Sequence, residues 1–179
     1  MASLCLEIEE HYNMPMDIEW AKDGMTNELF IVQARPETIH NKTRSISFKE
    51  YRLTEKGKVI TIGKAVGSKI VSGVARVLES PAEAHKLQPG EILVTDITNP
   101  DWNIVLKKAS VIITNKGGRT SHAAIVAREL GAAAVVGTTN ATEKITDGQL
   151  ITVSCAEGDE GRIYEGKLHW EEKEINLVN

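Results

Sequence analysis

The chain has 179 residues, enough for one ordinary domain with an appendage or for two small domains. Hydrophobic residues make up 41%, charged residues 26%, and the formal net charge is -4, so the chain lacks the basic surface that nucleic acid requires. Its short apolar stretches argue against a membrane-spanning helix. The acidic start without a secretory signal, and two cysteines without metal-ligand spacing, predict a cytoplasmic protein.

Residues 1–40 predict a helix followed by a β-hairpin. The helix is expected over Ser3–Tyr12, and the hairpin comes from two alternating runs, MDIEWAKD and NELFIVQAR, joined by a glycine-bearing turn. One helix and one hairpin bury too little surface to fold alone. We therefore interpret residues 1–40 as the C-terminal piece of a larger domain, and the polar residues 41–57 as a linker.

Residues 58–168 are dense in short β-branched runs and contain few helices, which predicts an α/β domain. The runs expected to form strands are KVITIGKAVG, KIVSGVARVLE, GEILVTDIT, ASVIITNKGG, AAAVVGTT, QLITVSC and GRIYEG. The segments expected to form helices are SPAEAHKLQ, NPDWNIVLKKA and TSHAAIVAREL, the last of them ended by Gly131 as C-cap. We expect Trp102 to anchor the core, with a docking face as the alternative. Residues 169–179 are interpreted as a tail with a short helix, leading toward a further domain.

The segment TNKGGRTSH carries the chemistry. A buried strand runs into Gly117 and Gly118, whose backbone N–H groups can approach an anion closely, and then directly into a helix whose N-terminus attracts the same anion. Arg119 adds donors suited to phosphate oxygens. Thr120 is expected to be the N-cap, and His122 stands in the first helical turn.

A histidine at this place can be a covalent phosphoryl carrier. Only neutral imidazole is a nucleophile, and the positive end of the helix dipole disfavours the cationic ring while it stabilises a phosphoryl group attached to it. Two plainer interpretations stay open on the residues alone: a phosphate-binding loop without a covalent step, and an ordinary packed or exposed histidine. The remaining histidines show no metal-ligand spacing with His122; they are His11, His40, His85 and His169.

The motif GGRTSHAAIVARELG, followed by AVVGT, resembles the phosphohistidine motif of the phosphoenolpyruvate (PEP)-utilising enzymes, which include PEP synthases, pyruvate phosphate dikinases and enzyme I of the sugar phosphotransferase system. The resemblance continues through KVITIGKAVG, LVTDITNPDW and DGQLITVSCAEGDEGRIYEG. The runs MDIEWAKDG and ELFIVQARPETI resemble the closing hairpin of an ATP-grasp domain, which enzyme I lacks. The resemblance therefore covers almost the whole chain and is strongest to the synthase group.

This resemblance implies a swivelling phosphohistidine domain of β/β/α type over residues 58–168. It implies the reaction ATP + pyruvate + water to AMP + PEP + phosphate, with His122 as the phosphoryl acceptor. Gly117, Gly118, Arg119 and Thr120 match the loop that holds the phosphoryl group. The family also carries Cys where this chain has Ser121, and Ile-Pro where it has Ala132-Ala133, changes expected to alter loop stiffness and not the chemistry.

In the hairpin, the resemblance implies that Glu19 and Gln33 hold Mg²⁺ and nucleotide and that Arg35 contacts ATP phosphates, which suits carboxylate, amide and guanidinium groups. Most of the ATP-grasp domain and the pyruvate-binding barrel are not in these 179 residues, so the chain alone is not expected to make PEP. Two other functions compete: a carrier of the pyruvate phosphate dikinase type, and a non-catalytic anion-binding regulatory module.

Overall fold

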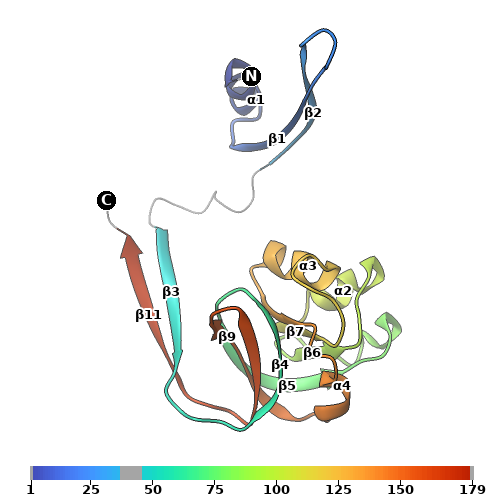
Figure 1. The fold of residues 1–179 in the computed structure, drawn as a ribbon, viewed down its shortest axis with the longest axis vertical. Helices are drawn as coiled ribbons and strands as arrows, with labels where there is room; N and C mark the ends of the chain where they lie inside the picture. The colour runs from blue at the N-terminus through green and yellow to red at the C-terminus, as the bar shows by residue number, and fades with distance from the viewer. Residues whose placement is uncertain (1, 37–45, 178–179) are drawn as a thin grey trace. The chain divides into compact units, whose positions relative to one another are not determined.

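The computed structural model describes residues 2–36 and 46–177, which fall into two compact units (Figure 1). The first unit contains helix α1 (Ala2–Tyr12) and the antiparallel strands β1 (Met16–Lys22) and β2 (Leu29–Pro36). The expected helix and hairpin are therefore both present. Asp23 closes the connection, because its Oδ1 accepts hydrogen bonds from the backbone N–H groups of Met25 and Thr26.

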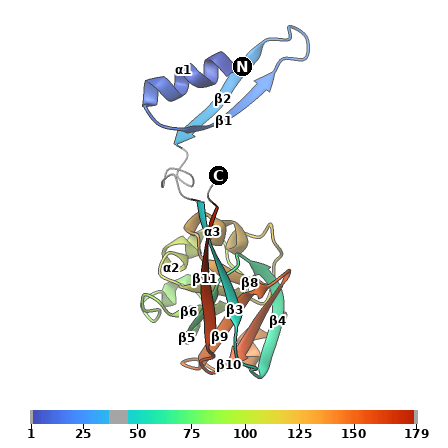
Figure 2. The ribbon, with the colours of Figure 1, turned by 90° about the vertical axis from the view of Figure 1, so that its left-hand side faces the viewer.

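A closed seven-stranded barrel forms the centre of the second unit (Figure 2). Its strands are β4 (Val59–Val66), β5 (Ile70–Val77), β6 (Ile92–Thr95), β7 (Val111–Thr114), β8 (Ala133–Val136), β9 (Leu150–Glu157) and β10 (Glu160–Glu165). Strands β5, β6, β7 and β8 run parallel, and β4, β9 and β10 close the barrel in antiparallel pairs. The predicted α/β class is confirmed, and all seven predicted strands are found.

The parallel strands β6, β7 and β8 are buried along their whole length and consist almost entirely of apolar residues, as expected when both faces of a strand are covered. In β6, Ile92 and Val94 belong to one core cluster, while Leu93 between them belongs to a second cluster, which includes residues of the helices. Strands β7 and β8 alternate in the same way. Helices α2 (Asn103–Leu106) and α3 (His122–Leu130) pack on this outer face of the strands (Figure 1).

Two of the predicted helices are much shorter than expected. SPAEAHKLQ forms only a 3-10 turn at Pro81–Glu83, and NPDWNIVLKKA forms a 3-10 turn at Pro100–Trp102 followed by the single turn of α2. Each begins as a capped proline turn, since Ser80 and Asn99 accept a backbone hydrogen bond at the start. Trp102 is buried in the core, as predicted. A short helix, α4 (Ala141–Lys144), was not predicted.

Strands β3 (Ile46–Leu53) and β11 (Trp170–Leu177) pair into a separate two-stranded sheet (Figure 2). The expectation of a short helix in the tail is therefore wrong. Residues 46–53, within the predicted linker, form a paired strand. Residues 37–45, which include the first part of the predicted linker, lie outside the described residues. This pairing gives both segments their extended conformation. Next to it, Thr54 N–H donates to the His169 carbonyl, 3.1 Å away, and so joins positions far apart in sequence.

Candidate functional site

The site lies where the parallel strands β6, β7 and β8 end. The carboxyl ends of parallel strands share one edge of a sheet, and polar loops follow all three strands there. Asn115 joins these loops: its side-chain N–H₂ donates to Asp96 at 3.1 Å and to Thr142 at 2.6 Å. Lys116 pairs with the other Asp96 oxygen at 2.7 Å. This network holds the loop that leads from β7 into α3.

Gly117 in this loop lies against Gly137, which follows β8. Both glycines have positive φ, +107° and +70°, a region that other residues rarely adopt. A Cβ on Gly137 would lie 2.7 Å from the Gly117 carbonyl oxygen, which is shorter than any normal contact. A Cβ on Gly118 would meet nothing within 4 Å, so the backbone at Gly118 is open to an approaching group.

His122 is the first residue of α3, and both nitrogens of its ring have partners. Nδ1 lies 3.1 Å from Thr98 Oγ1, and Nε2 lies 3.1 Å from Asn103 Oδ1. Thr98 is buried, whereas Asn103 is exposed. The ring is thus oriented from the segment between β6 and α2, with Nε2 on its more accessible side.

Thr98 and Asn103 were not identified from the sequence. One feature of the sequence points to them: both are polar residues that follow the buried strand β6, as His122 follows the buried strand β7. Only the parallel pairing of β6 with β7 brings these loops together.

The N-cap of α3 is Ser121, not the predicted Thr120. Ser121 has extended backbone angles, its carbonyl accepts the first helical hydrogen bond from Ile125 at 3.0 Å, and its side chain makes no capping bond. Thr120 stands one residue before the cap and is exposed. The predicted C-cap is confirmed, because Gly131 adopts the left-handed conformation at the end of the helix.

Arg119 pairs with an acid on the turn between β9 and β10. Its Nη2 lies 2.5 Å from Asp159 Oδ1, and this hydrogen bond holds the pKa of the Asp159 carboxyl below its usual range. The Arg119 carbonyl accepts a hydrogen bond from Arg128 Nη1 at 2.6 Å. Asp159 and the contact of Arg128 were not anticipated from the sequence.

The β1–β2 hairpin brings together the three residues predicted to bind Mg²⁺ and nucleotide, Glu19, Gln33 and Arg35. Glu19 is the register partner of Gln33, and Asp17 is the partner of Arg35, so all four side chains emerge on one face of the hairpin. Arg35 forms an ion pair with Asp17 at 2.9 Å. Carboxylate and amide oxygens beside a guanidinium fit a magnesium–phosphate group. Sequence reasoning missed Asp17, although it stands two residues before Glu19.

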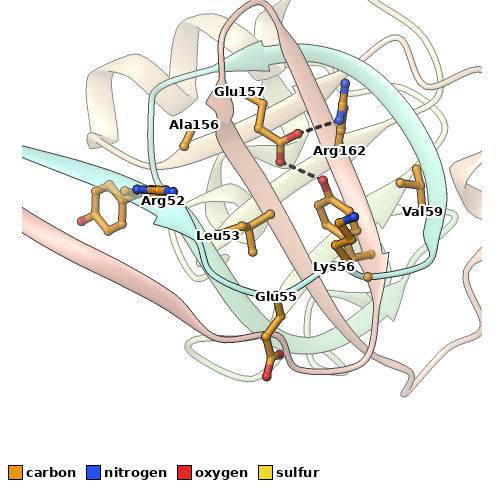
Figure 3. Close-up of a pocket in the computed structure, with 11 residues that line it drawn as sticks. Arg52, Leu53, Glu55, Lys56, Val59, Ala156, Glu157 and Arg162 are labelled. Atoms are coloured by element: carbon orange, nitrogen blue, oxygen red, sulfur yellow. Dashed lines mark hydrogen bonds and ion pairs between the residues drawn. The ribbon is translucent and has the colours of Figure 1, made fainter.

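A pocket of about 480 Å³ lies elsewhere, between the end of β3 and the β9–β10 hairpin (Figure 3). Its lining includes Arg52, Leu53, Lys56, Glu157, Arg162 and Tyr164. None of the predicted site residues contributes to it. In the parts of the chain that the structure describes, no three His, Cys, Asp or Glu side chains gather in a metal-binding cluster, and no helix is long and apolar enough to cross a membrane.

Comparison with known proteins places both units in one enzyme family. Residues 87–158 match the mobile domain of the PEP-utilising enzymes, and residues 1–55 match the AMP/ATP-binding domain of pyruvate phosphate dikinase. The chain belongs to the PEP-utilising enzyme family. It is 61% identical over 183 residues to phosphoenolpyruvate synthase of Aquifex aeolicus, a match that covers 96% of this chain and 21% of the relative.

Further relatives match at lower identity. Phosphoenolpyruvate synthase of Escherichia coli K12 is 52% identical, with 99% of this chain and 22% of the relative covered, and probable phosphoenolpyruvate synthase of Archaeoglobus fulgidus is 42% identical, with 96% and 22% covered. The chain thus spans about a fifth of the length of these relatives. A solution structure of an enzyme I protein shares 31% identity over 44% of this chain and 33% of its own, with a TM-score of 0.38.

Proposed function

We propose that this chain is the phosphoryl-carrier region of a phosphoenolpyruvate synthase and that His122 is its covalent acceptor. The observation that carries the proposal is the placement of His122: it opens a helix directly after a paired-glycine loop, with both ring nitrogens held. The names of the relatives supply PEP, and the name of the matching domain of pyruvate phosphate dikinase supplies pyruvate and ATP as the substrate class. The complete reaction, ATP + pyruvate + water to AMP + PEP + phosphate, belongs to a longer protein that contains the remaining domains.

Nε2 of His122 is the proposed nucleophile, because its partner Asn103 is exposed whereas Thr98, beside Nδ1, is buried. In the reverse half-reaction, the bond between phosphorus and the enol oxygen of PEP breaks as the Nε2–P bond forms. The electron pair stays on the enol oxygen, and the enol takes a proton from solvent to give pyruvate. Asn103 Oδ1 accepts a hydrogen bond from Nε2–H in the resting ring, so the nucleophilic tautomer forms when the proton moves to Nδ1, which then donates to Thr98 Oγ1, and the Asn103 amide turns its oxygen away from the Nε2 lone pair.

The loop before the helix is proposed to hold the transferred group. Backbone N–H groups at Gly117 and Gly118 and at the start of α3 would donate hydrogen bonds to the phosphoryl oxygens. A half-turn of the Asn103 amide would direct its N–H₂ group toward a phosphoryl oxygen as well. Arg119 and Thr120 stand next to this position. Together these donors would stabilise the dianion of a phosphoryl group on His122.

Mg²⁺ and nucleotide belong to the hairpin in this proposal. Glu19 and Gln33 would hold the ion, which when bound neutralises phosphate charge during transfer, and Arg35 would contact the ATP phosphates. Their common face on the hairpin supports this assignment. A cytoplasmic location is proposed as well, and the free thiols of Cys5 and Cys155 agree with it.

Phosphoryl transfer in trans tests the function. The chain is mixed with PEP, Mg²⁺ and a full-length synthase whose own carrier histidine is replaced, and its intact mass is measured. We expect one added acid-labile phosphoryl group that maps to His122. The matched control is His85→Ala, which removes an exposed histidine of the same unit and should leave the label unchanged. A folded chain that takes no label, or takes it elsewhere, would contradict the proposal.

A further inference from the structure

Arg119 and His122 are held on different sides of the glycine loop. His122 contacts Thr98 and Asn103, which lie between β6 and α2. Arg119 instead contacts the turn of the β9–β10 hairpin, with Nη2 at 2.5 Å from Asp159 Oδ1 and 3.4 Å from the Asp159 carbonyl oxygen. The guanidinium is therefore occupied by an acid that is distant in the sequence and separate from the partners of the histidine.

The hairpin presents Asp159 in a fixed position. Gly158, with φ +79°, and Asp159 form the turn, and the Asp159 carbonyl oxygen accepts a 3.0 Å hydrogen bond from Ala65 N–H on β4. Behind the turn, Glu157 pairs with Arg162 at 2.8 Å and accepts a hydrogen bond from the Tyr164 hydroxyl at 2.8 Å. Figure 3 shows Glu157 and Arg162 pointing toward one another across the hairpin. The backbone of Asp159 is thus held by β4, and the hairpin behind it is held by the contacts of Glu157.

The ion pair itself is exchangeable. Asp159 is 84% exposed and Arg119 is 43% exposed, so water and salt screen their attraction. A phosphoryl group carries nearly two negative charges and offers oxygens that match the guanidinium fork, so it is the stronger partner. A dianion on His122 would therefore draw Arg119 away from a single, solvated carboxylate.

The geometry points to Asp159 as a positioning residue that retains Arg119 in the unphosphorylated carrier and yields it to the phosphoryl group. This inference rests on the proposed function. It implies that the carboxylate of Asp159 competes with phosphohistidine for one guanidinium. The competition lowers the equilibrium fraction of phosphorylated carrier, and so it favours onward transfer.

The phosphorylation equilibrium of the full-length enzyme tests this inference. Intact mass is measured over a series of PEP-to-pyruvate ratios, and the ratio that half-phosphorylates His122 is compared among variants. Because exposed ion pairs are weak, we expect Asp159→Asn to lower the required PEP-to-pyruvate ratio by about two- to fivefold, and the shift to shrink in high salt. Asp159→Glu should behave like the wild-type protein.

A double-mutant cycle separates this role from a merely structural one. Arg119→Ala should raise the required ratio, and Asp159→Asn should add nothing in that background, because its effect acts only through Arg119. The matched control is Glu160→Gln, the neighbouring acid, which pairs with Arg162 and should change nothing. The inference is overturned if Asp159→Asn leaves the ratio unchanged or raises it, or if its effect persists without Arg119. Absence of any label on wild-type His122 would instead overturn the proposed function.

Discussion

The two units of the chain have equally regular secondary structure and very different interiors. Within residues 2–36 none of the described side chains is buried. Several large apolar side chains are solvent-exposed, among them Leu6 at 66% and Val32 at 65% exposure. The barrel unit contains two continuous core clusters whose central residues, such as Ile113 and Leu106, have no exposed surface. The barrel unit thus has a core of its own that can fix the geometry of a site, whereas the helix and the hairpin are held within this chain by local contacts only.

The candidate sites follow this difference. The ring of His122 is oriented by Thr98 and Asn103, and their segment is positioned by β6, a strand that is buried along its whole length. The polar face of the hairpin has its register set by one pair of strands only. We therefore expect the chemistry at His122 to be more sensitive to distant packing than binding at Glu19 and Gln33.

The largest expected effect is that of His122→Ala, which should abolish acid-labile labelling completely. The fold should survive, because the residue opens a helix, is partly exposed and does not belong to either core cluster. Intact mass measures the label, and circular dichroism measures the fold. Retained labelling in a folded variant would assign the phosphoryl group to another residue.

Truncating an apolar side chain should destabilise the protein far more in the barrel unit than in the hairpin. Ile113→Ala is expected to lower the free energy of unfolding of the barrel by about 2–5 kcal/mol, since it loses burial and leaves a cavity. Val32→Ala on the hairpin is the control, and should change stability by no more than about 0.5 kcal/mol. Urea unfolding followed by circular dichroism measures both. Similar losses for the two variants would mean that the hairpin carries a core of its own.

The two cysteines offer a chemical comparison of the units. Burial raises the pKa of the Cys155 thiol from 9.0 to about 11, so at pH 8 it has about a hundredfold less thiolate than in unfolded protein. Cys5 is partly exposed and serves as the control. Iodoacetamide should modify Cys5 in the native chain and Cys155 only after unfolding, as read by peptide mass. Equal native rates would show that the barrel opens readily.

The same pKa shift predicts a pH dependence of stability. The native thiol holds its proton more tightly than the unfolded one, so its contribution is full below pH 9.0 and is lost as the pH rises through about 11. Urea unfolding at pH 8, 9, 10 and 11 should show a decline that Cys155→Ala reduces. An identical decline in that variant would assign it to other groups.

A glycine pair gives the smallest expected effect and tests the loop directly. Gly137→Ala and Gly148→Ala both introduce a side chain at positive φ, but only the former places a Cβ 2.7 Å from the Gly117 carbonyl oxygen. We expect about 1 kcal/mol of destabilisation at Gly148, and about 1–3 kcal/mol with slower labelling of His122 at Gly137. Thermal unfolding and the labelling rate measure the two effects. Equal behaviour would mean that the loop need not pack against Gly137.

The seven barrel strands, the hairpin and the helix that His122 opens could be predicted from the sequence. Each depends on local pattern: apolar runs, turn glycines and the C-cap at Gly131. The glycine loop and the candidate histidine were also evident, because their residue types stand side by side in the chain. The N-cap was misassigned by one residue, from Ser121 to Thr120, since either hydroxyl suits a helix start and only backbone angles distinguish them.

What the tertiary structure alone decided are the contacts between distant segments. Thr98 and Asn103 reach His122 only because β6 pairs parallel to β7, and Asp159 reaches Arg119 only because the barrel closes through β10 and β4. The strands β3 and β11 acquire their conformation from each other, although more than 100 residues separate them. Local sequence determines which elements form, and burial of a shared core determines which of their side chains meet.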